Sequence, residues 1–225
     1  LVSPDMAELF CYDKKEKLVL PNPMSVDKSV VRTTIIPSLI NVYNYNKARK
    51  TEDIFLYEIS KTYDKNYQEE SKIAGLLKGN IVKSSWNGNI KCDFYVIKGI
   101  VEDILNSLGF TNRYTFVPEK LPNLHPGISA SILLDGEMLG IIGRVHPNTL
   151  KDEVYVFELS LNKLMRKVKP IKFKEPSKYP SIEKDVAFLI DRNINSLEIE
   201  KMIKKYSSRL LKGINVFDVY LGDNI

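Results

Sequence analysis

Hydrophobic residues recur at helical spacing in two stretches of the chain. After Ile35 the apolar positions fall three and four residues apart, and Pro37 fits the first turn of a helix. Between Asp93 and Gly109 the same spacing recurs; Asp93 can cap the start, and Gly109 can supply the left-handed residue beyond the end. The pattern predicts a buried amphipathic helix of about two to three turns after Ile35 and a longer one between Asp93 and Gly109.

Short runs of β-branched and aromatic residues predict strands. Ile54–Ser60 is typical of a strand buried on both faces. Asp135-Gly136 separates two apolar runs, 129–134 and 138–145, and tolerates the positive φ angles of a tight hairpin turn. Further strands are expected at 18–20 (an edge strand or ordered loop before Pro21-Asn22-Pro23), around Gly79 at 76–82, and at 154–159. Helices interspersed with hairpin-linked strands indicate an α+β fold with an antiparallel sheet.

The segment 163–180 separates this region from the rest of the chain. It contains three prolines and seven Lys or Arg residues, and no amphipathic periodicity continues through it. Beyond it we predict a strand at Asp185–Asp191, a helix starting at Asn195 with Glu198 in capping-box position, and a strand at Ile214–Leu221 before a turn at 222–224. This β-α-β unit is the opening half of a ferredoxin-like fold.

The predicted organisation is therefore a module at 1–168, a basic Pro-containing linker at 169–181 and a partial ferredoxin-like unit at 182–225. A sheet of two strands is marginal alone, and its unpaired edge attracts another strand. We expect 182–225 to be either poorly ordered or completed by strand pairing with a neighbouring copy.

Composition places the chain among packed soluble proteins. Its hydrophobic content is 44% and its charged content 27%. No apolar run approaches the ~20 residues that span a bilayer, and the start lacks a signal-peptide pattern. We expect a cytoplasmic protein with no membrane partner. The opening Leu1-Val2-Ser3, without an initiator Met, indicates an excised fragment.

The distribution of charge and the two cysteines bear on nucleic-acid binding, disulfides and metal sites. Residues up to Asn162 carry a net charge of −1, whereas those from Lys163 onward carry +6. A basic segment can attract nucleic-acid phosphates, but it can equally be a solvated linker. The two cysteines, Cys11 and Cys92, form no disulfide framework and have no metal-ligand spacing with His125 or His146. We expect buried or partly buried free thiols and no zinc.

Several motifs occur in an order that resembles one family. In the first module they are Asn22-Pro23-Met24-Ser25, Arg32-Thr33 with Pro37-Ser38-Leu39, Phe55-Leu56-Tyr57-Glu58-Ile59, Leu124-His125-Pro126-Gly127 with Ser129-Ala130, and Gly140-Ile141-Ile142-Gly143 with His146-Pro147. In the tail they are Pro176-Ser177-Lys178-Tyr179-Pro180, Lys184-Asp185-Val186-Ala187, and Phe217-Asp218-Val219-Tyr220 with Gly222. Over residues 18–224 the chain resembles the C-terminal part of the β subunit of bacterial-type phenylalanyl-tRNA synthetase, with Ser38 where that family usually has Gly.

The resemblance implies a fold and a role. Residues 1–168 would form a class II synthetase-like antiparallel sheet flanked by helices, and 182–225 the first half of a ferredoxin-fold anticodon-binding domain. The chain would be a structural partner of the catalytic α subunit in an α2β2 heterotetramer and would contribute to tRNA(Phe) binding. ATP and Mg²⁺ would belong to the whole phenylalanine–tRNA ligase, with no cofactor in this fragment.

The sequence lacks the arginines of a class II active site. Such a site uses one arginine followed by an acidic partner and a second after a Gly-x-Gly-x-x-Arg turn to neutralise the ATP phosphates. Arg32 is followed by Thr33-Thr34, and Arg144 follows Gly143 directly. We therefore predict no adenylation by this fragment and assign no catalytic or metal-binding residue.

Three groups of residues are candidates for other roles. Arg32 suits an ion pair with the α subunit or within the chain, and the helix after Ile35 suits either the subunit interface or the module's own core. The candidates are Arg32, Ile36, Leu39, Ile40 and Tyr43 for the subunit interface, Lys178, Lys184, Arg209 and Lys212 for the tRNA backbone, and His125, Gly127 and His146 for structural turns. In those turns we expect a neutral imidazole that donates to a backbone carbonyl.

Two other function classes stay open. A free-standing RNA-binding or interaction module would have this fold without a ligase partner, and co-purification with an α subunit separates the two. An autonomous class II enzyme would catalyse pyrophosphate exchange by itself, which we do not expect.

Overall fold

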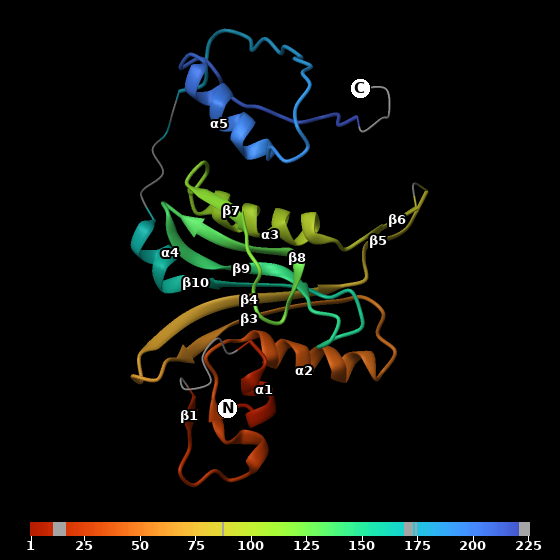
Figure 1. Cartoon of the computed structure of the whole chain (residues 1–225), viewed down its shortest axis with the longest axis vertical. Helices are drawn as coiled ribbons and strands as arrows, with labels where there is room; N and C mark the ends of the chain where they lie inside the picture. The colour runs from red at the N-terminus through yellow and green to blue at the C-terminus, as the bar shows by residue number, and fades with distance from the viewer. Residues whose placement is uncertain (11–16, 87, 169–172, 174, 221–225) are drawn as a thin grey trace. The chain divides into compact units, whose positions relative to one another are not determined.

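The computed structural model describes residues 1–10, 17–86, 88–168, 173 and 175–220, and the chain divides into two compact units, Leu1–Lys172 and Phe173–Ile225 (Figure 1). The first unit contains a six-stranded antiparallel sheet with the strand order β3-β4-β10-β9-β8-β7. These strands are β3 (Ile54–Tyr63), β4 (Glu69–Lys78), β7 (Tyr114–Pro118), β8 (Leu124–Leu134), β9 (Glu137–Val145) and β10 (Tyr155–Ser160). Two small antiparallel pairs accompany the sheet: β1 (Leu18–Val19) with β2 (Val30–Val31), and β5 (Asn80–Ser85) with β6 (Gly88–Lys91).

Helices cover the sheet from both sides, which confirms the predicted class of an antiparallel sheet flanked by helices. Helix α2 (Ile36–Lys47) packs on β3, β4 and β10, and α3 (Phe94–Ser107) packs on the opposite face against β9 and β10 (Figure 1). We call these the α2 face and the α3 face of the sheet. Shorter helices are α1 (Pro4–Glu8), the 3₁₀ turn η2 (Val26–Lys28) and α4 (Leu161–Lys167).

Both predicted helices of the first unit are confirmed, with their end signals. Pro37 lies in the first turn of α2. The Asp93 side chain accepts from the Val96 N–H at 2.8 Å at the start of α3, and Gly109 follows its end with φ +79°. The hairpin prediction is also confirmed, because Asp135 and Gly136 join β8 to β9 with φ angles of +52° and +83°.

The strand prediction for 54–60 was right in position but wrong in burial. β3 is an edge strand, so β4 is its neighbour on one side only, and its side chains alternate between buried or half-buried and exposed. The sequence also gave no sign of α1, α4, β7 or the first part of β4. β4 begins with Glu69 and Glu70, and acidic residues are uncommon in strands. In the structure Glu69 faces solvent and Glu70 accepts a hydrogen bond from the Ser160 hydroxyl.

The second unit contains helix α5 (Ser196–Tyr206), which starts after Asn195 as predicted. The Asn195 side chain makes no capping bond to the backbone, so this part of the prediction was wrong. Among the described residues, 185–191 and 214–220 form no strand. Leu221 and the predicted turn at 222–224 lie outside the described residues, and completion by another chain stays a prediction.

A buried carboxylate joins α2 to the sheet. Glu158 on β10 is 7% exposed, and its Oε1 accepts from the Thr34 hydroxyl at 2.8 Å and from the Ile35 N–H at 2.6 Å. Its Oε2 lies 3.2 Å from the Lys72 ammonium of β4. Helix α2 has no side-chain cap of its own, so a negative charge from β10 satisfies a donor at its N-terminus.

Replacing this carboxylate tests how strongly it holds α2. Glu158→Gln leaves the Lys72 ammonium without its buried anion, and we expect the free energy of unfolding to fall by about 2–4 kcal/mol in urea denaturation. Glu153→Gln is the matched control, because its side chain is 49% exposed beside Arg144, and we expect a change within about 0.5 kcal/mol. Equal losses in the two variants would contradict this role for Glu158.

Candidate functional site

The apolar side chains predicted for the subunit interface lie inside the module's own core. Ile36, Leu39, Ile40 and Tyr43 are at most 3% exposed and pack on the α2 face. The Tyr43 hydroxyl also donates to Asp152 at 2.5 Å, and burial together with Asp152 raises the pKa of that hydroxyl. These four side chains therefore take the core alternative in this structure, because this side of α2 is covered by its own sheet.

Arg32 is engaged within the chain. Its Nη2 lies 2.6 Å from Glu58 Oε1 and 2.5 Å from the Ser60 hydroxyl, and its Nη1 donates to the Ser38 hydroxyl at 3.0 Å. Ser38 occupies the position where the resembled family usually has Gly. The intramolecular alternative for Arg32 therefore holds in this structure.

Arg32 and Arg144 lie on opposite faces of the sheet. Arg32 bonds to Glu58, which pairs with Ala74 on the α2 face. Arg144 pairs in register with Tyr155, which pairs with Leu77 on the α3 face. Arg144 itself lies 3.4 Å from Glu153. With a sheet between them, the two guanidinium groups cannot hold the phosphates of one nucleotide.

The histidine turns differ in one detail from the prediction. His125 Nδ1 accepts from the Gly127 N–H at 3.1 Å, and His146 Nδ1 accepts from the Asn148 N–H at 3.1 Å. Each ring thus accepts a bond from the backbone two residues on, where a donation to a carbonyl was expected. Both bonds span one proline, Pro126 or Pro147, and hold the turn locally.

The remaining candidates are the basic residues of the second unit and the two cysteines. The basic residues Lys178, Lys184, Arg209 and Lys212 are all exposed in the second unit. Cys92 is a buried free thiol whose pKa is raised by burial, and Cys11 lies outside the described residues. Within the described ranges, no three His, Cys, Asp or Glu side chains gather in a metal-binding group, and no helix is long and apolar enough to cross a membrane.

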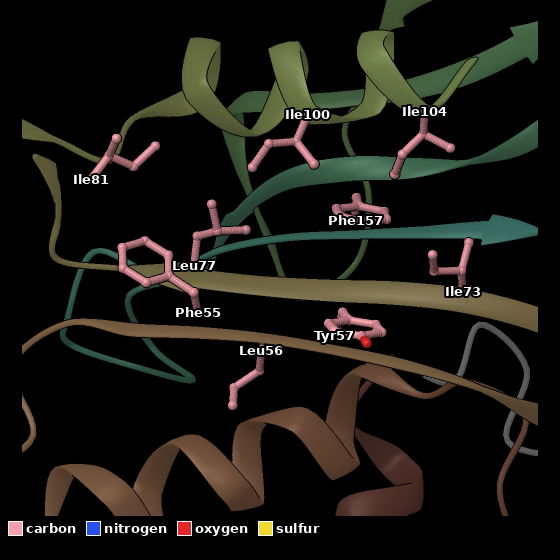
Figure 2. A pocket seen from close by; sticks show the side chains of 9 residues that line it. All are labelled: Phe55, Leu56, Tyr57, Ile73, Leu77, Ile81, Ile100, Ile104 and Phe157. Carbon is pink, nitrogen blue, oxygen red and sulfur yellow. The ribbon is translucent and has the colours of Figure 1, made fainter. Parts of the chain in front are cut away.

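The structure reveals an apolar groove that sequence reasoning missed. It has a volume of about 410 Å³ and lies on the α3 face, between helix α3 and the edge strand β3. Figure 2 shows Ile100 and Ile104 pointing from α3 toward the strands, whereas Leu56 points to the α2 side. We call this the β3–α3 groove; its lining residues are Phe55, Leu56, Tyr57, Ile73, Leu77, Ile81, Ile100, Ile104 and Phe157.

An alternating apolar row of β3 begins in this groove with Phe55 and Tyr57 and continues beyond it with Ile59. Phe55, Tyr57 and Ile59 are 47%, 77% and 60% exposed. Between them Glu58 faces the other side of the sheet and pairs with Arg32. Period-two alternation puts the three apolar side chains together on the α3 face, where no helix among the described residues of the first unit packs on β3.

The floor of the groove depends on the close approach of the Phe157 ring to the backbone of β4 at Gly75. Phe157 lies over β4 so that a Cβ added to Gly75 would come within 2.4 Å of its ring. Glycine at position 75 therefore lets the ring rest on the backbone of β4. Two ion pairs lie elsewhere on the strands that line the groove or next to them, Lys61 with Glu69 (2.6 Å) and Lys83 with Asp53. Each lysine lowers the pKa of its partner carboxyl.

The outer edge of β3 is also open. The Tyr63 N–H points outward to the Arg32 carbonyl at 3.1 Å. Because backbone direction alternates along a strand, the N–H and C=O groups of Phe55, Tyr57 and Ile59 point outward as well. In the part of the chain that the structure describes, no segment pairs with them.

Comparison with known proteins identifies relatives over the whole chain. Residues 1–161 match the family model of the phenylalanyl tRNA synthetase beta chain CLM domain, and residues 177–225 match that of the ferredoxin-fold anticodon binding domain. The phenylalanine–tRNA ligase beta subunit of Bacillus subtilis (strain 168) is 37% identical over 236 residues, and that of Geobacillus kaustophilus (strain HTA426) is 35% identical over 236. Each alignment covers 100% of this chain but 29% of the relative, so the chain spans less than a third of their length.

A solved structure gives a weaker match. Pyrrolysyl-tRNA synthetase from Desulfitobacterium hafniense is 14% identical, with a TM-score of 0.47 over 67% of this chain and 52% of its own. This similarity is too low to carry an argument about function.

Proposed function

Because the chain belongs to the family of phenylalanyl-tRNA synthetase beta chains, we propose that it is the part of a phenylalanine–tRNA ligase that holds the catalytic α subunit and contacts tRNA(Phe). In this proposal the chain works in the cytoplasm within an α2β2 heterotetramer and performs no adenylation of its own. The single observation that carries the proposal is the placement of Arg32 and Arg144 on opposite faces of the sheet, each beside a glutamate of this chain.

The described residues do not fit a Mg²⁺–ATP complex. The Arg32 guanidinium is held by Glu58, Ser60 and Ser38, so binding a phosphate there would require breaking an ion pair and two hydrogen bonds. Within the described part of the chain there is also no cluster of three acidic or histidine side chains that would hold the metal. The ATP, Mg²⁺ and phenylalanine of the ligase reaction are therefore assigned to the α subunit.

The tRNA contact is proposed from charge and exposure. Residues from Lys163 onward carry a net charge of +6, and the four candidate side chains Lys178, Lys184, Arg209 and Lys212 are exposed. Flexible cationic side chains bind phosphates without reading bases. The match of residues 177–225 to an anticodon-binding domain model supports this assignment.

Pyrophosphate exchange tests the division of labour. We expect the chain alone to give no phenylalanine-dependent ATP–pyrophosphate exchange, because the two arginines cannot reach one triphosphate. We also expect the chain to co-purify with a co-expressed α subunit. Exchange by the chain alone would show an autonomous enzyme, and tRNA binding without any α subunit binding would show a free-standing RNA-binding module; either result would overturn the proposal.

Charge removal tests the tRNA contact. Replacing Lys178, Lys184, Arg209 and Lys212 with Ala should weaken tRNA(Phe) binding at least about ten-fold at low salt and reduce the slope of log K against log salt by about 3. A quadruple control replaces four exposed lysines of the first unit: Lys28, Lys50, Lys120 and Lys151. Equal losses in filter binding would mean that nonspecific charge, and not the second unit, holds the RNA.

A further inference from the structure

The β3–α3 groove has the shape and chemistry of a seat for one more helix. We infer that the catalytic α subunit inserts an amphipathic α-helix into this groove, beside α3 and over β3 and β4. The inference rests on the proposed function, because it requires an α subunit as the partner, and it adds the place and the manner of docking.

The layer of helices on the α3 face of the first unit is incomplete. A helix is about 10 Å wide and strands lie about 4.8 Å apart, so one helix covers roughly two strands of a sheet. On the α3 face, α3 packs on β9 and β10, and α4 contacts β4. Within the first unit this leaves open the stretch of β3 and β4 that carries Phe55, Tyr57 and Ile73, which is two strands wide and so matches one further helix.

The open stretch of β3 and β4 is lined by apolar side chains. Apolar side chains form its floor from β3, β4 and β10, and Ile100 and Ile104 form one wall. Tyr57 and Ile59 are more than half exposed although they lie side by side on one face. A contiguous apolar patch of this kind marks an interaction site. Covering it requires a partner surface with apolar residues three and four positions apart.

The length of the apolar row on β3 and a negative charge on α3 specify the partner helix further. From Phe55 to Ile59 the strand rises about 13 Å, the length of roughly nine helical residues. Asp103 is exposed three residues after Ile100, on the same side of α3. The expected partner is therefore a helix of at least about nine residues, with an apolar stripe toward the sheet and a Lys or Arg toward α3.

An added strand is a weaker candidate for the same place. The outward backbone groups of Phe55, Tyr57 and Ile59 could pair with a strand at the edge of the sheet. Such a strand would lie beside β3 in the plane of the sheet, and it would leave the 410 Å³ groove above β3 and β4 unfilled. A helix on the α3 face fills the groove directly.

Two tyrosines provide a matched pair of variants. Tyr57 in the groove and Tyr95 on α3 are 77% and 76% exposed, and Tyr95 does not line the groove. With co-expressed α subunit, we expect Tyr57→Lys to weaken α subunit binding at least about ten-fold, because it places a charge against the docked apolar stripe. Tyr95→Lys should bind like the unmodified chain, and both variants should keep its thermal midpoint.

Site-specific photo-cross-linking identifies what lies in the groove. A benzoylphenylalanine at position 57 should cross-link to α subunit residues spaced three and four apart, and one at position 95 should give no such pattern. Cross-links to α subunit residues spaced two apart would show an added strand. Cross-links to a second copy of this chain, or to α5 of the same chain, would name a different occupant; each of these results overturns the inference.

The outcome for the unmodified chain separates this inference from the proposed function. If the unmodified chain does not bind the α subunit, the proposed function fails. If it binds and Tyr57→Lys binds equally well, the docking site is elsewhere and only this inference fails.

Discussion

The register of β10 against β4 fixes both the stability and the surface of the first unit. Phe157 and Glu158 are neighbours in sequence, so the strand turns them to opposite faces. Glu158 holds Lys72, Thr34 and the start of α2 on one face. Phe157 rests over Gly75 on the other face and forms the floor of the β3–α3 groove. A shift of one residue would put the aromatic ring on the α2 face and the carboxylate on the α3 face, and both features would be lost.

This arrangement gives the two faces of the sheet different surfaces. The α2 face uses its charged groups internally, in the Arg32–Glu58 and Lys72–Glu158 pairs, so the Arg32 guanidinium is already engaged there. The α3 face keeps large apolar side chains exposed along β3. Covering the exposed part of each side chain would contribute at most roughly 1.5–3 kcal/mol, and this apolar surface lies on the face opposite to the Arg32–Glu58 and Lys72–Glu158 pairs.

Much of the fold could be predicted from sequence because its signals are local. Asp93 and Gly109 mark the ends of α3, and Asp135-Gly136 marks the hairpin. The groove could not be predicted in this way, because the sequence pattern of Ile54–Ser60 fits a strand covered on one face as well as a strand covered on both faces. Only the strand order shows that β3 is an edge. The same limit applies to α2, whose apolar residues gave equal support to a core and to an interface.

Hydrogen–deuterium exchange on the chain tests the scaffold account most directly, with and without the α subunit and with and without Mg²⁺–ATP. The account predicts that the α subunit slows amide exchange in β3 and α3, and that nucleotide alone changes nothing around Arg32 or Arg144. Protection of the segments around these two arginines by nucleotide in the absence of the α subunit would contradict it, because it would mean that the sheet holds the triphosphate itself.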